Sequence, residues 1–305
     1  MAKLKVSGHL AAHLLVAVGV GLSACGQEVE VSPAPPKVPR PQPAPAAGGT
    51  AKRDPLARVA PGSRLTITVR DDDGEKFRYS APRSVRGGLV DIRLLNKSTA
   101  RRKAQLWRIV GDHTIQEALR APRPRPAWLQ IAGGVSYTLP RQSGRSLQVL
   151  QPGRYYVANE AGDPGIVASF MVIAPAGHAP EPPGAPARIE ARDYSFRVSG
   201  LRPGRNSIDL ENVGAQPHHA FFAPLRKGAD IGQVRRFFSE TNSIGAPPVD
   251  SDGSVESAVL AGGERQVLEL DLRPGRYALV CFVTNNGGGP QHIELGMINE
   301  VRVRR

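Results

Sequence analysis

Two similar stretches, Leu150-Gln-Pro-Gly-Arg-Tyr-Tyr-Val157 and Leu272-Arg-Pro-Gly-Arg-Tyr-Ala-Leu279, decide how this chain is organised. Each places a Pro-Gly pair before an apolar, aromatic run, which is typical of a turn that leads into a β-strand. Upstream of them, Ile92-Arg-Leu-Leu-Asn96 matches Ile208-Asp-Leu-Glu-Asn212 in the same order and at similar spacing. The pattern therefore indicates a tandem duplication.

Both repeats read as β-structure. Short runs of alternating apolar and polar residues, such as Leu65-Thr-Ile-Thr-Val69, are typical of half-buried strands. We also expect one helical segment in each repeat, at 114–120 and at 230–240, and the second of these has apolar residues at helical spacing. Several short strands separated by turns in each repeat predict an all-β fold of two tandem Greek-key β-sandwiches.

The composition along the chain of 305 residues sets the expected domain limits. We expect a first domain at 59–175 and a second at 187–305, joined by a Pro-rich linker at 176–186. Residues 25–58 are rich in proline, alanine and glycine and cannot bury a core, so they predict a disordered tether.

The first residues read as an export signal. Lys3 and Lys5 precede a short apolar run that ends in Leu22-Ser-Ala-Cys25. This ending resembles the lipobox of bacterial lipoproteins, which implies that residues 1–24 are removed and that Cys25 carries lipid. The protein would then be extracytoplasmic and anchored to the cell membrane through its acyl chains. The alternative is an ordinary secreted protein cut near Ala24.

Charge and cysteine content narrow the possible partners. The formal net charge is +13, but nucleic acid is not an expected partner for an exported protein, and most of this charge is expected to be a solvated surface. The chain has two cysteines, Cys25 and Cys281. If Cys25 carries lipid, Cys281 has no intrachain disulfide partner and is either buried and inert or a metal ligand.

Three segments of the second repeat bring together residue types that suit one metal. Asn212-Val-Gly-Ala-Gln-Pro-His218-His219 comes first, Arg276-Tyr-Ala-Leu-Val-Cys281 follows, and His292-Ile-Glu-Leu-Gly-Met297 comes last. Copper that carries single electrons requires a soft thiolate, two imidazoles and a weak axial thioether. The order of these residues therefore predicts a blue-copper site between the final strands.

This set resembles the cupredoxin family, plastocyanin and its relatives in particular, from about residue 187 to the end of the chain. The resemblance implies that His218, Cys281, His292 and Met297 bind one type 1 copper ion. His219 is the alternative to His218, because adjacent strand residues face opposite sides. Ten residues separate Cys281 from His292, which is longer than the usual loop of the family.

The first repeat lacks these ligands. Asn159 takes the place of Cys281, and Arg102 takes the place of His218 when the repeats are aligned. We therefore expect a degenerate cupredoxin-like domain that binds no copper.

The expected function is single-electron transfer with a redox protein partner, or the holding of copper outside the membrane. The alternative is a copper-free binding or scaffold lipoprotein in which Cys281 is only buried. An enzyme is not expected, because the sequence holds no Gly-x-Ser-x-Gly, Walker or His-Glu-x-x-His motif. An oxidase would need further histidine-rich copper centres, and two of the seven histidines lie in the predicted signal peptide.

Overall fold

The computed structural model describes residues 62–72, 76–122, 125–159, 167–175, 177, 180–239 and 245–304, and these belong to one compact unit. The predicted signal peptide 1–24, Cys25 and the tether 25–58 lie outside the described residues. Within the described ranges, no helix is long and apolar enough to cross a membrane.

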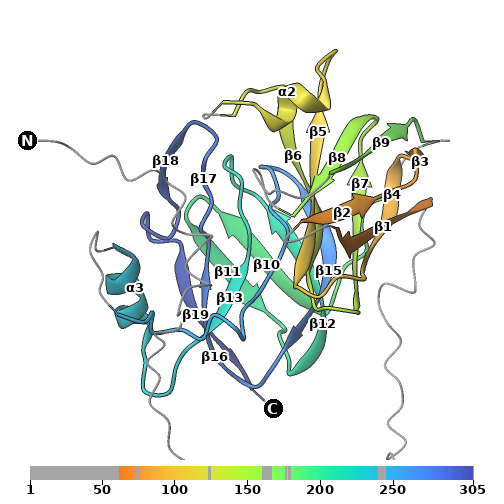
Figure 1. Ribbon diagram of the computed structural model, residues 1–305. Coiled ribbons are helices and arrows are strands. Elements are labelled where there is room, and N and C mark those ends of the chain that lie inside the picture. Colours follow the sequence, from red (N-terminus) through yellow and green to blue (C-terminus); the bar gives the residue numbers. More distant parts are fainter. Residues whose placement is uncertain are drawn as a thin grey trace, which may run out of the picture. The chain divides into compact units, whose positions relative to one another are not determined.

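The first repeat consists mainly of strands, which pack as two facing sheets (Figure 1). Its elements are β1 (Ser63–Asp71), β2 (Phe77–Ser80), β3 (Ser84–Arg86), β4 (Gly88–Asn96), β5 (Arg102–Ile109), α2 (Ile115–Leu119), β6 (Leu129–Thr138), β7 (Ser143–Leu150), β8 (Gly153–Ala158) and β9 (Ala168–Ile173).

The second repeat has a similar order of elements. They are β10 (Ala187–Arg192), β11 (Ser195–Ser199), β12 (Gly204–Asn212), β13 (Phe221–Pro224), α3 (Ile231–Ser239), β14 (Val255–Glu256), β15 (Arg265–Leu272), β16 (Gly275–Val280), β17 (Thr284–Asn285), β18 (Gly288–Gln291) and β19 (Ile298–Val303). Among the described residues this repeat has no counterpart of β3, and it carries an additional hairpin, β17–β18.

One eight-stranded sheet runs through both repeats, in the order β11-β10-β12-β15-β7-β4-β1-β2. Its two halves mirror each other: β1 pairs in parallel with β4, as β10 does with β12, and the halves join where β7 and β15 pair antiparallel. The facing sheets are also equivalent, because β9-β8-β5 in the first repeat corresponds to β19-β16-β13 in the second. The duplication predicted from sequence is thus visible in the topology.

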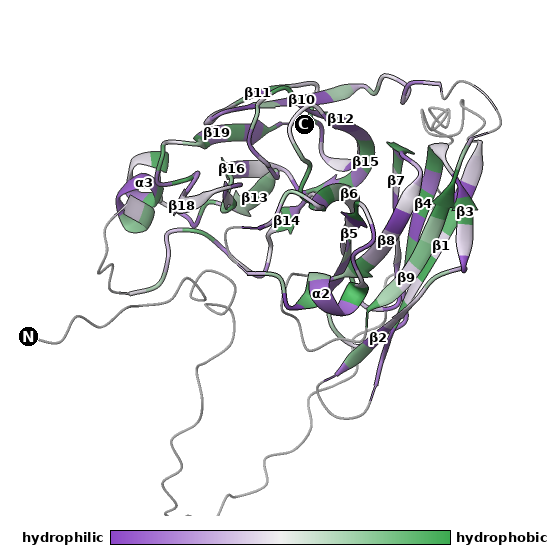
Figure 2. Ribbon diagram, turned by 90° about the horizontal axis from the view of Figure 1, so that it is seen from above, coloured by the Kyte–Doolittle hydropathy of each residue, from purple (hydrophilic) through white to green (hydrophobic). Residues whose placement is uncertain are grey.

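Alternation of apolar and polar residues explains why these segments form strands that pack face to face. In β1, the side chains of Leu65, Ile67 and Val69 are fully buried while their neighbours are not, and Figure 2 shows the alternating hydropathy. Each repeat encloses its own apolar core, which contains Tyr155 in the first repeat and the equivalent Tyr277 in the second. The prediction of an all-β fold with two sandwiches is confirmed.

The helices expected at 114–120 and 230–240 are present as α2 and α3. Thr114 caps α2 through its side-chain oxygen, and Glu117 reaches back to the Thr114 backbone N–H, which completes a capping box. The predicted domain limits, 59–175 and 187–305, stay predictions, since several residues near these limits lie outside the described ranges.

Candidate metal centre

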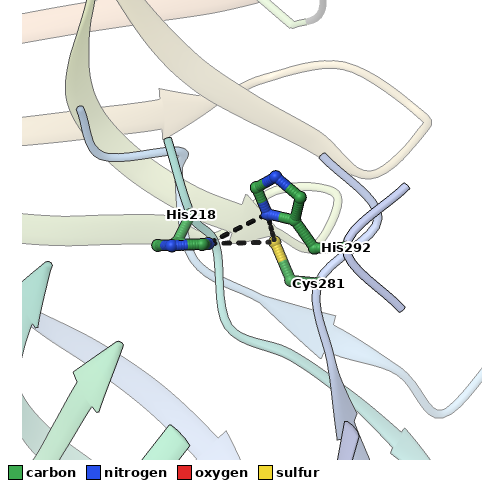
Figure 3. A group of neighbouring side chains, drawn as sticks. All are labelled: His218, Cys281 and His292. Atoms are coloured by element: carbon green, nitrogen blue, oxygen red, sulfur yellow. Dashed lines mark hydrogen bonds between the residues drawn. The ribbon is translucent and has the colours of Figure 1, made fainter. Parts of the chain in front are cut away.

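Three of the predicted ligands converge at one end of the second sandwich (Figure 3). The Cys281 Sγ lies 3.5 Å from His292 Nδ1 and 3.8 Å from His218 Nδ1, and the two Nδ1 atoms lie 3.0 Å apart. All three side chains are almost completely buried. The residues come from positions up to 74 apart in sequence, so the fold itself creates this cluster.

Backbone hydrogen bonds fix each of the three residues. His218 forms an antiparallel bridge with Leu260 through bonds of 3.0 and 2.9 Å. Cys281 directly follows β16, which lies between β13 and β19 in its sheet, and its carbonyl accepts the Ile293 N–H. His292 follows the hairpin of β17 and β18, and its N–H donates to Val283. The long loop between the thiol and the second imidazole is therefore an ordered hairpin.

The outer nitrogens of both imidazoles are already bonded. Nε2 of His218 lies 2.8 Å from Oδ1 of Asp193, and Nε2 of His292 lies 2.9 Å from Oδ1 of Asn285. Both oxygens are acceptors, so each Nε2 carries the proton and each Nδ1 presents a lone pair. Two lone pairs then face one another beside a thiol that has a single proton to donate, and a cation among the three atoms resolves this arrangement.

Burial sets the protonation of the group in the absence of metal. It raises the pKa of the Cys281 thiol to about 12, and it lowers the pKa of His292 to about 4, helped by the nearby His218 and His219. Burial also lowers the pKa of His218, although the Asp193 carboxylate opposes this shift. At neutral pH the three groups are therefore uncharged, and a metal ion must displace the thiol proton.

The spacing and chemistry of the donors fit a type 1 copper site. Protein nitrogen and sulfur donors bind divalent metals at about 2.0 to 2.3 Å, so donors around one ion lie about 3 to 4 Å apart. The three distances of 3.0 to 3.8 Å fall in that interval. A thiolate with two imidazoles is the trigonal donor set of blue-copper centres.

Met297, the fourth predicted ligand, lies in the same buried core cluster as Cys281. Its side chain is fully buried, its carbonyl accepts the Cys281 N–H, and its own N–H donates to the His292 carbonyl. These bonds tie Met297 to two members of the cluster. Its role as an axial ligand stays a prediction.

His219, the alternative first ligand, faces another direction. Its Nε2 accepts the Phe282 backbone N–H at 3.0 Å, and its Nδ1 lies 3.4 Å from the Glu256 carboxylate. His218 is therefore the histidine that meets the thiol, as adjacent residues on extended backbone face opposite sides.

The equivalent place in the first repeat holds other groups. The Asn159 side-chain oxygen accepts the Lys103 N–H, and the Arg102 guanidinium lies 3.8 Å from the centroid of the Phe77 ring. Among the described residues, His218, Cys281 and His292 form the one group of three or more histidine, cysteine or acidic side chains close enough together to hold a metal ion.

Sequence reasoning missed three residues that complete the centre. Asp193 and Asn285 bind the outer nitrogens, and the Tyr194 hydroxyl bonds to Asn285 at 3.1 Å while its ring packs edge-on against His292. Asp193 and Tyr194 lie in the turn between β10 and β11, about 25 residues before the first ligand. No local motif marks them, although Asn285 lies in the insert that the sequence does mark as unusual.

No family model and no curated protein matches the chain. Among solved structures, a multicopper oxidase aligns with 15% identity over 79% of this chain and 88% of its own, at a TM-score of 0.22. Auracyanin B aligns with 21% identity over 39% of this chain and 87% of its own, at a TM-score of 0.25. An auracyanin of Roseiflexus castenholzii gives 16% identity over 39% and 95%, at a TM-score of 0.25. Because these scores are low, the side-chain geometry has to decide the chemistry.

Proposed function

We propose that this protein is an extracytoplasmic, lipid-anchored copper protein whose second sandwich binds one type 1 copper ion for single-electron transfer or copper holding. One observation carries the proposal: the Nδ1 lone pairs of His218 and His292 converge on the Cys281 sulfur, while both Nε2 atoms are bonded elsewhere. Two buried acceptors that face each other without a proton or cation between them are unfavourable, so a cluster with a purely structural role would not be expected to have this arrangement.

The residues of the centre suit a metal ion that gains and loses one electron while its ligands stay in place. Copper, when bound, supplies a one-electron couple. Asp193 and Asn285 hold the two imidazoles in orientation, and such outer contacts increase the basicity of the ligands. Strands β13, β16 and β19 hold the Cys281 backbone, and burial excludes water from the sulfur. A rigid, dry ligand set of this kind keeps the reorganisation that accompanies electron transfer small.

The proposed function includes attachment to the membrane through Cys25 and a redox protein as partner. The lipobox-like ending at Cys25 supports attachment of two or more acyl chains, which hold a protein stably at a membrane. Residues 25–58 would then act as a tether that gives the folded part reach toward a redox protein. An exported basic protein is suited to an acidic protein partner and not to nucleic acid.

Electron transfer or copper holding is favoured over oxidase catalysis by the ligand supply. Outside the predicted signal peptide the chain has five histidines, namely His113, His178, His218, His219 and His292. His219 bonds to the Phe282 backbone, and His113 stacks on Trp128 in the first repeat. Five histidines are too few to supply a multinuclear copper centre in addition to the His218 site, so we infer that the protein is not an enzyme.

A copper titration of residues 26–305, followed by visible absorption, tests the proposal. We expect an intense thiolate-to-copper band at one equivalent of Cu(II), abolished in Cys281→Ser and in the double variant His218→Ala/His292→Ala. His113→Ala, a histidine remote from the cluster, is the matched control and should keep the band. A protein that takes up neither Cu(II) nor Cu(I) at stoichiometric levels would refute the proposal and favour the copper-free scaffold.

A further inference from the structure

We propose that strand β5 of the first repeat positions the metal centre of the second, with Gln105 and Lys103 as positioning residues. This inference rests on the proposed function and deepens it, since it assigns a role to the repeat that lacks the ligands. Two separate paths of contacts start from β5. Each path ends at a residue that is adjacent to, or bonded to, a predicted copper ligand.

The first path of contacts starts at Gln105, a residue that is only 2% exposed. Its Oε1 accepts the Val259 N–H at 2.8 Å, and its Nε2 donates to the Val259 carbonyl at 3.1 Å. The amide thus pairs with both backbone groups of one residue, as a neighbouring strand would. The Gly133 N–H also donates to the Val259 carbonyl, so the first repeat binds Val259 from two elements.

The residue after Val259 meets the first ligand directly. Leu260 and His218 exchange two backbone hydrogen bonds, at 2.9 and 3.0 Å. Asn212 adds a bond from its side-chain nitrogen to the Leu260 carbonyl at 3.1 Å. The position of the His218 backbone therefore depends on Leu260, and the position of Leu260 depends on the bonds that Gln105 makes to Val259.

The second path of contacts starts at Lys103 and passes through two buried side chains. The Lys103 ammonium lies 2.7 Å from Oε1 of Glu256, and the side chains of this pair are 6% and 5% exposed. The other Glu256 oxygen lies 3.4 Å from Nδ1 of His219, whose Nε2 accepts the N–H of Phe282. Phe282 directly follows Cys281 in sequence, so this path of contacts ends beside the thiolate ligand.

These two paths of contacts give the first repeat, which has no ligands of its own, a role in the metal centre of the second. By the repeat alignment, Lys103 takes the place of His219, and both of these equivalent residues contact Glu256. Arg101 adds bonds to the carbonyls of Asp252 and Ser254, so β5 and its approach hold the segment around Glu256 at several points. The first repeat thus acts as an outer frame for a site that it does not itself contain.

Removing either residue should alter the centre in a defined way. Gln105→Met keeps volume but leaves the Val259 backbone groups without their side-chain partner, so the 259–260 segment and His218 should loosen. Lys103→Met removes the positive charge that faces Glu256, a carboxylate that interacts electrostatically with Cys281, and loss of a nearby positive charge favours Cu(II) over Cu(I). The first variant should weaken ligand geometry, and the second should lower the reduction potential.

The matched control for Gln105 is Asn206. Its buried amide likewise pairs with both backbone groups of one residue, Arg202, at 2.9 and 2.7 Å. It lies at the start of β12, whereas the metal centre lies beyond the other end of that strand. Asn206→Leu should therefore lower stability to a similar extent without an effect on the ligands.

The experiment compares the full chain 26–305 with Gln105→Met and Asn206→Leu by hydrogen exchange without copper and by spectroscopy with Cu(II). We expect the His218 and Leu260 amides of Gln105→Met to exchange about tenfold faster, the equivalent of about 1.4 kcal/mol, and its thiolate-to-copper band to shift or weaken. Asn206→Leu should leave both readouts as in the parent chain. Equal effects of the two variants on these amides and on the band would overturn the inference.

The reduction potential of Lys103→Met decides the matter independently if Gln105→Met does not fold. A shift to lower potential supports the inference, and a potential equal to that of the parent chain overturns it. Failure of the parent chain to bind copper would refute the proposed function instead. The exchange rates of the copper-free variants would still report whether Gln105 holds His218 in place.

Discussion

The carboxylate of Asp193 accepts a hydrogen bond from Nε2 of His218 at 2.8 Å. The same carboxylate accepts the backbone N–H groups of Ala215 and Gln216, at 3.0 and 3.1 Å. Burial alone would raise the pKa of Asp193, but these bonds outweigh burial and hold the pKa below its usual value. Asp193 is therefore an anion at neutral pH that keeps the His218 proton on Nε2 and its lone pair on Nδ1.

Gly214 leaves the space that this carboxylate occupies. A Cβ at Gly214 would overlap Oδ1 of Asp193, so Gly214→Ala should displace the carboxylate from His218. Loss of such an outer contact typically costs about tenfold to a hundredfold in metal affinity. Competition with a chelator for Cu(II) measures the change. Gly184→Ala, at a glycine with no atom within 4 Å of its Cβ position, is the control and should bind copper as the parent does.

Copper binding should release about one proton per ion near neutral pH. The pKa of the copper-free Cys281 thiol is about 12, whereas that of His292 is about 4, so at pH 7 only the thiol has a proton to lose on forming a copper bond. Calorimetry of Cu(II) binding in two buffers of different ionisation enthalpy counts this proton. A count near zero would mean that the thiol is already ionised without metal.

The copper-free chain should lose stability as the pH falls from about 6.5 to about 4. The pKa of His292 is about 4 in the folded protein, against an ordinary histidine pKa of 6.5, so in this window the unfolded chain binds the proton and the folded chain does not. A shift of this size corresponds to about 3 kcal/mol at most. Urea unfolding at pH 7 and pH 4.5 measures the effect.

His292→Asn should flatten this acid dependence, because asparagine does not titrate. His113→Asn, at a side chain that is 40% exposed, should leave the dependence as it is. An equal loss of stability in all three chains would assign the acid effect to other groups.

Short-range patterns made most of the fold predictable. The repeated Leu-x-Pro-Gly-Arg-Tyr motif marked β8 and β16, and the alternation around Leu65 marked β1. The Cys281 and His292 segments were visible because chemistry-bearing residue types stood in a fixed order. Such local signals survive because turn geometry and side-chain alternation act over a few residues.

Long-range contacts could not be predicted in the same way. Nothing near Asp193 or Gln105 in sequence indicates that they contact His218 or Val259, because those contacts arise when distant strands pair. The shared eight-stranded sheet was missed for the same reason, since the pairing of β7 with β15 depends on how the two sandwiches meet. The length of the 282–291 segment alone does not indicate its structure, and its glycines allow the β17–β18 hairpin.

Glu264, between the Ala261 turn and β15, should make the protein less stable as the pH rises. Burial raises its pKa to about 7, and its Oε2 atom has no hydrogen-bond partner among the described residues. Between the ordinary glutamate pKa of 4.5 and about 7, the unfolded chain loses this proton while the folded chain keeps it, so each increase in pH favours unfolding. The penalty reaches about 3 kcal/mol at most above pH 7. Glu264→Gln, which keeps the shape and stays neutral, should match the parent near pH 4 and exceed it at pH 8, as urea unfolding of the copper-free chains would measure. If the difference between the two chains is the same at both pH values, then Glu264 is ionised in the folded protein and the Arg108 charge nearby is sufficient to compensate its burial.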